Sequence, residues 1–467
     1  MRQDCVVVLD VGKTLAKLTM WSADGGLVDR ATRPNEPRMS RHGYPSLDVE
    51  GIEAWLACTL GRFAGQRTIR AIVPVAHGAA AVIMRPDGSW IEPLDYEAAL
   101  PDALREQYLA QRDPFIETGS PALPCGLNLG AQLHWLEAML PTEFAAGTIV
   151  TWPQFWAWRL SGVAATEVTS LGTHTDLWRP FEGRPSRMAE RRGWAGRLAP
   201  LRRASDVLGT VTAGWRARCG LPEQCAVACG IHDSNADLLA VRARIGHHDH
   251  TVLSTGTWFI AMRSCPDKPD LAALPEARDC LVNVNAFGIP VPSARFMGGR
   301  EAELLEEGVQ LDPAAYAEAL VEHASRLVRS GVFALPAFQK GVGPFPESEG
   351  CWIGRPGDQF GRRAAAGLYL ALMADVSLDL IGSRERLVVE GRFMADPVFV
   401  RALASLRPDQ TVLLAPSSDS LCHGAIGLIA PEATPESELL QVEPLPFALA
   451  GYARQWRELL AGAARSG

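Results

Sequence analysis

The sequence predicts an α/β protein of two domains, and three observations carry the prediction. Each half of the chain opens with an apolar strand, a Gly/Thr turn and a second strand, at residues 6–20 and 251–262. The remaining segments alternate short apolar strands with stretches of helical spacing, which is typical of a layered α/β domain. The length of 467 residues allows two or three domains, each with its own core. We place the main boundary between residues 244 and 245.

The first half begins with the strand 6–10, which ends in Asp10, and the turn Gly12-Lys13-Thr14. The backbone amides of a Gly/Thr turn between two strands can point at a phosphate. The spacing predicts a helix over 51–63 and a strand over 68–75, which places His77-Gly78 at the end of that strand. Further along we expect an amphipathic helix over 128–140 and a buried aromatic cluster at Trp152, Phe155, Trp156 and Trp158.

The middle of the chain carries the sequence Cys229-Gly230-Ile231-His232-Asp233. An apolar strand over 226–228 precedes it, and Ala236 begins a helical pattern, so Asp233 is expected at a strand-to-helix turn. A side chain there can project into a cleft, where the positive end of the helix would stabilise a carboxylate. Asp233 could equally be a helix cap, since Asp-Ser-Asn before a helix is ordinary capping chemistry.

The second half starts again with the strand 251–254, the turn Thr255-Gly256-Thr257 and the strand 258–262. This repeats the opening of the first half and indicates two phosphate-facing loops, one in each domain. Later elements alternate in the βα manner and are expected as helices over 313–330, 361–381, 397–406, 422–429 and 452–464 and strands over 387–390 and 411–415. The last helix is expected to belong to the second domain or to pack back on the first.

The composition narrows the classes of protein. A net charge of −8 and the lack of a dense Lys/Arg block argue against a nucleic-acid surface. The N-terminus enters its first strand too soon for a secretory leader, and no apolar run is long enough for a membrane span. Ten scattered cysteines without a CxxC pair suit reduced thiols in a cytoplasmic protein. The stretch His247-His248-Asp249-His250 could bind a metal, although it lacks spaced partners.

In order and spacing, these motifs resemble the FGGY carbohydrate kinases, which have the two-domain actin-like ATPase fold, also called ribonuclease-H-like, with the active site in the interdomain cleft. Asp10-Val11-Gly12-Lys13-Thr14 is similar to the family's first phosphate motif and Ser254-Thr255-Gly256-Thr257 to the second. Gly230-Ile231-His232-Asp233 resembles the segment that holds the catalytic base. His77-Gly78 is similar to the sugar-contacting pair of the rhamnulokinase, fuculokinase and xylulokinase branches. The likeness covers nearly the whole chain.

The resemblance implies roles for named residues. Asp233 would be the catalytic base and would share Mg²⁺ with Asp10, while His77, Gly78 and His232 would bind the sugar. ATP would be held by seven residues, namely Gly12, Lys13, Thr14, Thr255, Gly256, Thr257 and Gly391. Two departures stand out: Lys13 replaces a small or hydroxyl residue, and Glu390-Gly391-Arg392 replaces a Gly-Gly-Gly that lies against the adenosine.

The expected protein is therefore an ATP-dependent cytoplasmic kinase of a small ketose such as L-rhamnulose or L-fuculose. Its partners would be the sugar, ATP and Mg²⁺, without nucleic acid or membrane, and a homodimer stays open. The first alternative is a non-catalytic sugar or nucleotide sensor on the same fold, which the departure at 390–392 suggests. A metal hydrolase that uses His232, Asp233 and the histidines at 247–250 is a more distant alternative.

Overall fold

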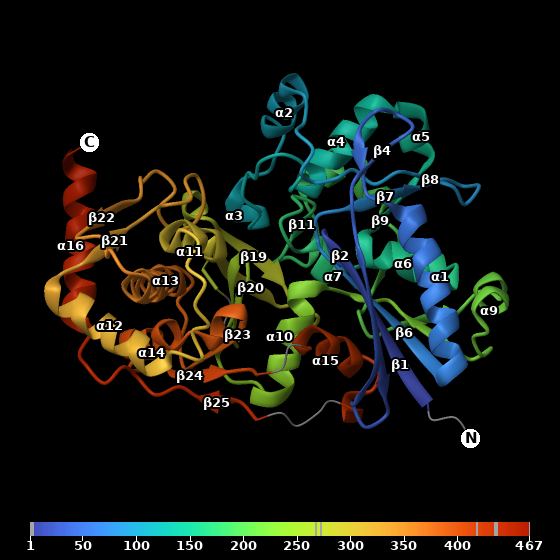
Figure 1. Ribbon diagram of the computed structural model, residues 1–467. Coiled ribbons are helices and arrows are strands. Elements are labelled where there is room, and N and C mark those ends of the chain that lie inside the picture. Colours follow the sequence, from blue (N-terminus) through green and yellow to red (C-terminus); the bar gives the residue numbers. More distant parts are fainter. Residues whose placement is uncertain (1–3, 267–268, 271–272, 417–418, 434–437, 467) are drawn as a thin grey trace. The chain divides into compact units, whose positions relative to one another are not determined.

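The computed structural model describes residues 4–266, 269–270, 273–416, 419–433 and 438–466 (Figure 1). Residues 1–3, on which the argument against a leader partly rests, lie outside these ranges. The chain forms two compact units. Unit 1 comprises residues 1–244, 282–290 and 419–436, and unit 2 comprises residues 245–281, 291–418 and 437–467. The chain therefore returns twice to unit 1 after residue 244, which a single boundary at 244/245 does not describe.

Unit 1 is built on a mixed sheet of seven strands. Its centre is β1 (Asp4–Val11), which pairs antiparallel with β2 (Leu15–Ser22) and parallel with β6 (Thr68–Ala76). The other strands are β3 (Leu27–Pro34), β14 (Val207–Thr210), β15 (Ala226–Ala228) and β16 (Ile231–His232). Apart from Asp4 at its start, β1 is buried along its length, as an apolar strand covered on both faces should be.

Alternate residues of β1 serve two different cores. Val7 and Leu9 belong to a core shared with α1 (Val49–Gln66) and α6 (Trp152–Ser161). Val6 and Val8 belong to a second core shared with α10 (Asp233–Ile245) and α15 (Ser420–Gly427). Figure 1 shows the strands β1 and β6 between α1 on one side and α15 on the other. The period of two along a strand explains this division.

The rest of unit 1 is a region of short elements that carries a small three-stranded sheet. Three aromatic side chains of the expected cluster, Trp152, Phe155 and Trp156, are buried in the core, so this part of the prediction is confirmed. The elements are α2 (Asp102–Leu109), α3 (Phe115–Thr118), α4 (Leu129–Met139), α5 (Pro141–Ala146), α7 (Val168–Leu171), α8 (Arg187–Arg191), α9 (Ala213–Cys219), β4 (Arg38–Met39), β5 (Pro45–Ser46), β7 (Ala81–Met84), β8 (Trp90–Ile91), β9 (Thr148–Thr151), β10 (Thr166–Glu167), β11 (Trp178–Arg179), β12 (Arg184–Pro185) and β13 (Leu201–Arg202).

Unit 2 repeats the central plan of unit 1. β17 (His250–Thr255) pairs antiparallel with β18 (Phe259–Ser264) and parallel with β23 (Arg386–Gly391), as β1 does with β2 and β6. β20 (Pro290–Phe296) follows β18, and β24 (Thr411–Leu414) follows β23. The internal repeat expected from the sequence is thus present at the level of strand order. The outer strands of this sheet are β19 (Cys280–Val284) and β25 (Leu440–Gln441), and β21 (Phe333–Leu335) pairs with β22 (Cys351–Ile353).

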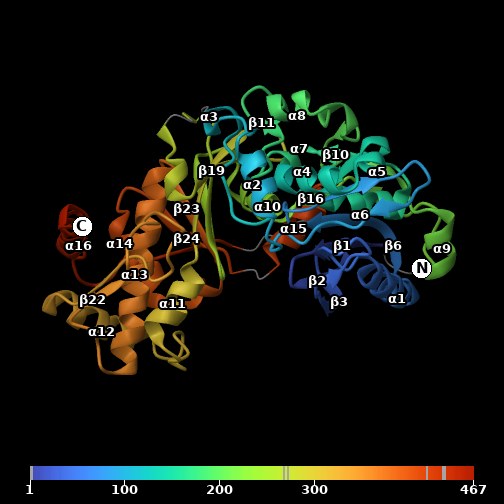
Figure 2. The same ribbon diagram turned by 90° about the horizontal axis from the view of Figure 1, so that it is seen from above.

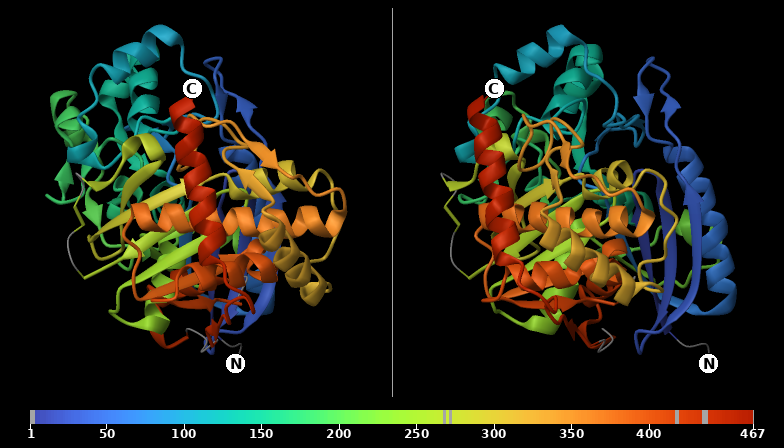
Figure 3. Two further views of the ribbon diagram at one scale, coloured as in Figure 1. Left: turned by 90° about the vertical axis from the view of Figure 1, so that its left-hand side faces the viewer. Right: turned by 60° about the vertical axis from the view of Figure 1, so that its left-hand side comes forward.

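The helices of unit 2 gather on one side of its sheet. They are α11 (Gly298–Glu306), α12 (Ala317–Ser330), α13 (Gln359–Leu380), α14 (Pro397–Leu406) and α16 (Ala450–Ser466), and Figure 2 shows them beside β23 and β24. In Figure 3 the red α16 crosses the orange helices of the same unit. The Trp456 indole N–H donates to the Ala334 carbonyl at 2.8 Å. The last helix therefore packs within unit 2.

Candidate active site

The predicted site residues of unit 1 lie at one edge of its sheet. Asp10 is paired in register with Val75 of β6, and Ile231 of β16 is paired with the same residue from the other side. Because β1, β6 and β16 are parallel, their carboxyl ends meet at that edge, where ligands of open α/β sheets bind. The structure thus brings together Asp10, His77 and Asp233 from three separate stretches of sequence.

Asp10 is buried and faces Lys17 directly across the β1–β2 ladder. The Lys17 Nζ lies 3.0 Å from the Asp10 Oδ2. Burial raises the pKa of the Asp10 carboxyl, Lys17 opposes that rise, and the nearby Asp233 carboxylate adds to it. Two carboxylates therefore stand within electrostatic reach of each other, and only one of them has a lysine partner.

Asp233 is the first residue of α10, and its carboxylate uses a single oxygen. Oδ1 accepts hydrogen bonds from the Ser234 amide at 2.6 Å and the Ser234 hydroxyl at 3.2 Å, and it lies 3.1 Å from the His232 Nε2. Among the described residues, Oδ2 has no partner, and the side chain is 30% exposed. An N-cap side chain accepts from an amide two or three residues ahead, so these contacts do not favour the capping interpretation.

His232 is engaged at both ring nitrogens. Nδ1 lies 3.1 Å from the Asn235 side-chain amide, while Nε2 contacts Asp233. Burial lowers the pKa of His232, so the ring is neutral at pH 7, accepts from Asn235 and donates to Asp233. A Cβ on Gly78 would lie 3.1 Å from this ring and 2.6 Å from Thr173. Glycine at position 78 therefore lets the turn at His77 approach His232.

His77 offers a free polar atom to the site. Its Nδ1 accepts from the Ala79 amide at 3.3 Å, and its buried Nε2 has no partner among the described residues. Burial lowers the pKa of His77 to about 4, although the Asp233 carboxylate opposes that change. The ring is therefore neutral, with an Nε2–H that has no acceptor among the described residues. An unpaired buried donor is costly and indicates a ligand atom that would accept from it.

The first predicted phosphate loop is held by hydrogen bonds from Asn35, a residue outside the loop. The Asn35 side chain donates to the Gly12 carbonyl at 2.9 Å, and the Asn35 amide donates to the Thr14 carbonyl at 2.8 Å. The Gly12 amide itself donates to the Leu15 carbonyl. Thr14 is exposed and its hydroxyl forms no hydrogen bond with the described residues. The hydroxyl of Thr14 is thus available to a ligand.

Lys13, in the same loop, turns to a segment that the sequence did not single out. Its ammonium forms an ion pair with Asp95, lies 3.4 Å from the Glu97 carboxylate and sits 5.1 Å above the Tyr96 ring. The Tyr96 ring meets the His77 ring edge-on at 5.5 Å. Lys13 thus contacts the residues around His77, and its expected phosphate contact stays a prediction.

The second predicted phosphate loop lies in unit 2 and also contains a turn closed by a glycine amide. The Gly256 amide donates to the Trp258 carbonyl at 3.0 Å, and Thr257 is exposed. Thr255, in contrast, is buried: its hydroxyl donates to the Glu390 carbonyl and accepts from the Phe393 amide at 3.1 Å. The Thr255 hydroxyl therefore connects β17 to the segment after β23.

Gly391 stands opposite Thr255 in the parallel pairing of β17 and β23. Its φ is +86°, and a Cβ there would lie 2.3 Å from the Thr255 carbonyl oxygen. Only glycine fits this backbone. Of its neighbours, Glu390 is buried in β23, while Arg392 is exposed with its guanidinium carbon 4.8 Å from the Phe393 ring. The two substituted positions therefore differ, and only Arg392 presents its side chain at the surface of unit 2.

The histidine-rich stretch does not form a metal centre. Asp249 pairs with Arg263 at 3.0 Å, and the His250 Nδ1 contacts the His248 carbonyl at 2.8 Å. Within the ranges that the structure describes, no group of three or more His, Cys, Asp and Glu side chains converges as a metal site. Mg²⁺ needs only one or two protein carboxylates beside phosphate oxygens and water. The carboxylates of Asp10 and Asp233, which lie within electrostatic reach of each other, fit that demand.

Sequence reasoning missed the support behind Asp233. The Thr169 hydroxyl accepts from the His232 amide at 3.0 Å, and the same hydroxyl donates to Glu167. Glu167 is fully buried, and burial raises its pKa to about 7. Lys17 was also missed, although it could have been found: a lysine opposite Asp10 in the predicted hairpin is a cross-strand charge pair.

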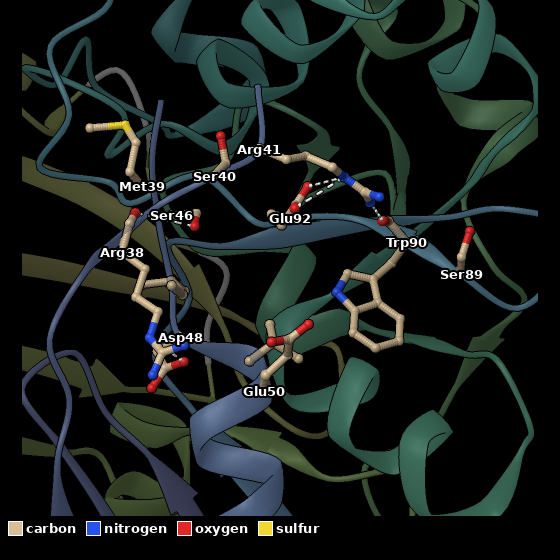
Figure 4. Close-up of a pocket in the computed structure, with 12 residues that line it drawn as sticks. Arg38, Met39, Ser40, Arg41, Ser46, Asp48, Glu50, Ser89, Trp90 and Glu92 are labelled. Carbon is tan, nitrogen blue, oxygen red and sulfur yellow. Dashed lines mark hydrogen bonds and ion pairs between the residues drawn. The ribbon is translucent and has the colours of Figure 1, made fainter. Parts of the chain in front are cut away.

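A separate hollow of unit 1 has a volume of about 450 Å³ and lies beside the hairpin of β4 and β5. Figure 4 shows the Arg41 guanidinium directed at the Glu92 carboxylate and the Trp90 carbonyl. Arg38 pairs with Asp48 in the same way, at 2.9 Å. None of the predicted site residues lines this hollow, so it is distinct from the site at the strand ends.

Within the described ranges, no helix combines the length and the apolar character needed to traverse a bilayer.

The two units share the same central strand plan, and unit 1 carries the carboxylates of Asp10 and Asp233 at its strand ends. This arrangement is that of the two-domain actin-like ATPase fold. The chain is similar to the crystal structure of a carbohydrate kinase from Novosphingobium aromaticivorans, with 47% sequence identity and a TM-score of 0.95. The match covers 99% of this chain and 100% of that chain. Residues 247–437 match the family described as "Carbohydrate kinase FGGY, C-terminal domain". The chain belongs to the FGGY family of carbohydrate kinases, and the expected family and fold are confirmed.

More distant relatives carry several substrate names. A xylulose kinase from Rhodospirillum rubrum shares the fold at a TM-score of 0.78 and 20% identity, with 99% of this chain and 98% of that chain covered. The L-fuculokinase of Escherichia coli K12 is 25% identical over 280 residues, which are 56% of this chain and 57% of that protein. The chain thus spans little more than half the length of this relative.

Proposed function

We propose that the protein is an ATP-dependent carbohydrate kinase that transfers the γ-phosphoryl group to a hydroxyl of a small uncharged sugar. The sugar would be a ketose such as L-rhamnulose or L-fuculose. The observation that carries the proposal is that two polar atoms without protein partners among the described residues lie at the same edge of the unit 1 sheet. The Asp233 Oδ2 can accept a hydroxyl proton, and the His77 Nε2–H can donate to a second sugar oxygen.

Asp233 would act as the catalytic base. In the reaction, the bond between the γ-phosphorus and the bridging oxygen of ADP breaks, while a bond forms from the sugar oxygen to phosphorus. The hydroxyl proton passes to the Asp233 carboxylate as that bond forms. A carboxylate is a weak base, yet it suffices because the transition state of phosphoryl transfer is loose and the proton leaves late. His232 orients the carboxylate by its hydrogen bond to Oδ1.

Asp10 and Asp233 are the residues that would hold Mg²⁺, directly or through water. The metal would neutralise charge on the phosphate oxygens during transfer. Lys17 opposes the rise that burial causes in the Asp10 pKa and so favours the ionised carboxylate, the form that would bind a cation.

The nucleotide phosphates would lie against the two Gly/Thr loops. Thr14 and Thr257, both exposed, supply the hydroxyl groups, and the turns at Gly12 and Gly256 supply further backbone contacts. Thr255 and Gly391 support the second loop by joining β17 to β23, and Gly391 also offers the adenosine a surface without a side chain.

The charges around His77 favour a neutral sugar over a sugar acid. One ammonium, from Lys13, faces the two carboxylates of Asp95 and Glu97, which leaves a net charge of −1 beside the ring. A substrate carboxylate would meet like charge there, and such a juxtaposition is costly. A gluconate kinase from Lactobacillus acidophilus shares the fold at 13% identity, and its substrate class is the one that these charges disfavour.

The test is an ADP-release assay with ATP and Mg²⁺ across ketoses, aldoses, polyols and gluconate, accompanied by calorimetric binding of each sugar. Turnover that is highest with an uncharged ketose is the expected result. Binding of sugar and ATP without ADP release would instead support the sensor alternative. A preference for gluconate would overturn the proposed substrate class while keeping the kinase.

A further inference from the structure

Lys13 and Asp95 form an ion pair between two segments that are 82 residues apart in the sequence. Lys13 lies in the loop between β1 and β2, and Asp95 lies just after β8. The side chains are 13% and 3% exposed. An ion pair at such low exposure differs from a surface ion pair, because removal of either partner leaves a charge that water reaches poorly.

The backbone holds Asp95 firmly. Its amide donates to the Pro45 carbonyl at 2.9 Å, and its Oδ1 accepts from the Glu97 amide at 2.9 Å. Lys13 has a flexible stem, so the fixed carboxylate determines where the ammonium stands. The loop that bears Lys13 is thereby tied to the segment 95–97, whose Tyr96 contacts His77.

The Lys13 ammonium, a hydrogen-bond donor, lies between two acceptors, the carboxylates of Asp95 and Glu97. An ammonium has three N–H donors, and the Asp95 and Glu97 carboxylates take up two of them at most by the contacts seen here. The third donor and the remaining carboxylate oxygens can serve adjacent hydroxyl groups of a sugar, each of which both donates and accepts. Phosphate oxygens only accept, so carboxylates beside the ammonium suit a hydroxyl group better.

We propose that Lys13 and Asp95 act as one unit that determines sugar specificity, with the Lys13 ammonium serving the sugar instead of the ATP phosphates. This inference rests on the proposed function, since it names the groups by which that same site recognises an uncharged sugar. Asp95 positions Lys13, and Lys13 contacts the substrate.

A double-mutant cycle tests the unit. The variants are Lys13→Met, Asp95→Asn and the two combined, with the exposed pair of Lys340 and Glu349 treated as Lys340→Met and Glu349→Gln for comparison. The readouts are kcat, KM for sugar, KM for ATP, Tm, and calorimetric Kd for L-rhamnulose and L-fuculose without ATP. Each single change at 13 or 95 should weaken sugar binding about 10- to 100-fold, because a charge-assisted hydrogen bond is lost. The double variant should lose no more than the worse single, and the KM for ATP should change little.

Three outcomes would overturn the proposal. A rise in the KM for ATP with sugar binding unchanged would assign Lys13 to the phosphates. Independent, additive losses at 13 and 95 would show that the two residues are not one unit. A lower Tm with every Kd and KM unchanged would leave a purely structural ion pair.

The cycle also separates this inference from the proposed function. Wild-type protein that binds the sugar but releases no ADP would end the kinase proposal, and the calorimetric cycle would still measure the pair. If the wild type binds neither ketose, the proposal for the pair is overturned as well.

Discussion

Asp10 and Lys17 face each other across the β1–β2 ladder, with the carboxylate buried and the ammonium 42% exposed. This asymmetry makes the two residues respond differently to mutation. When its partner is removed, the Lys17 side chain, which is 42% exposed, can be hydrated far more readily than the Asp10 side chain, which is 9% exposed.

Asp10→Asn should therefore leave the fold nearly as stable as the wild type while raising the Mg²⁺ concentration needed for half-maximal activity. Lys17→Met, in contrast, should lower the free energy of unfolding by about 1–3 kcal/mol, because the buried Asp10 carboxylate loses its partner. Tm measurements on both variants, with activity titrated against Mg²⁺, check the pair. Turnover by Asp10→Asn that is unchanged at limiting Mg²⁺ would remove Asp10 from the metal site.

His77 gives a prediction for pH and stability. Its pKa is about 4 in the folded protein against an ordinary value of 6.5, so between these values the unfolded chain binds the extra proton. The contribution of neutral His77 to stability is thus complete above pH 6.5 and declines as the pH falls towards 4, by at most about 1.4 kcal/mol per pH unit.

In His77→Gln that decline should disappear, so the stability gap to the wild type should change between pH 7 and pH 4. The exposed His248 is the matched control, and His248→Gln should run parallel to the wild type. At neutral pH, His77→Gln should also raise the KM for sugar about 2- to 10-fold, the effect of one lost hydrogen bond, with the KM for ATP unchanged. Urea unfolding curves that stay parallel for His77→Gln would contradict the burial argument.

The next prediction compares the same substitution, Gly→Ala, at Gly391 and at Gly256. A methyl group at 391 would lie 2.3 Å from the Thr255 carbonyl oxygen at a φ of +86°, whereas at 256 the nearest atom lies 3.7 Å away. With a ψ of −163°, this positive-φ conformation is essentially restricted to glycine and costs an L-residue about 1–3 kcal/mol. Gly391→Ala should lower the Tm by several degrees and Gly256→Ala by much less. Equal Tm values would show that the backbone at 391 relaxes freely.

The sequence was sufficient to predict the elements that depend on local pattern. The apolar run of β1, the repeated strand–turn–strand unit and the long helix α13 follow from periodicities of 2 and 3.6 residues. The positions of Asp10, His77 and Asp233 followed as well, because each ends a predicted strand or begins a predicted helix.

What the sequence could not show depends on contacts distant in the chain. Asp95 sits in a loop without periodicity, so nothing local marks it as the partner of Lys13. Glu167 supports His232 through Thr169, a chain of bonds that only the folded backbone reveals. The return of α15 to unit 1 rests on Ala425 and Ile426 packing with β1 and β6, and an apolar helix face does not name its partner.

Asp233 is the central residue of the proposed phosphoryl transfer, and its Oδ2 has no partner among the described residues. Removal of a positioned general base typically lowers the rate by about 10²- to 10⁴-fold. Asp233→Asn keeps the size of the side chain and can cap a helix as well as Asp does, so a merely structural role would survive the change.

The decisive measurement is the kcat of Asp233→Asn, taken beside its Tm and its calorimetric affinity for ATP. We predict a protein that melts within a few degrees of the wild type and binds ATP, with kcat lowered by about 10²-fold or more. A stable variant with the kcat of the wild type would contradict the assignment of Asp233 as the catalytic base.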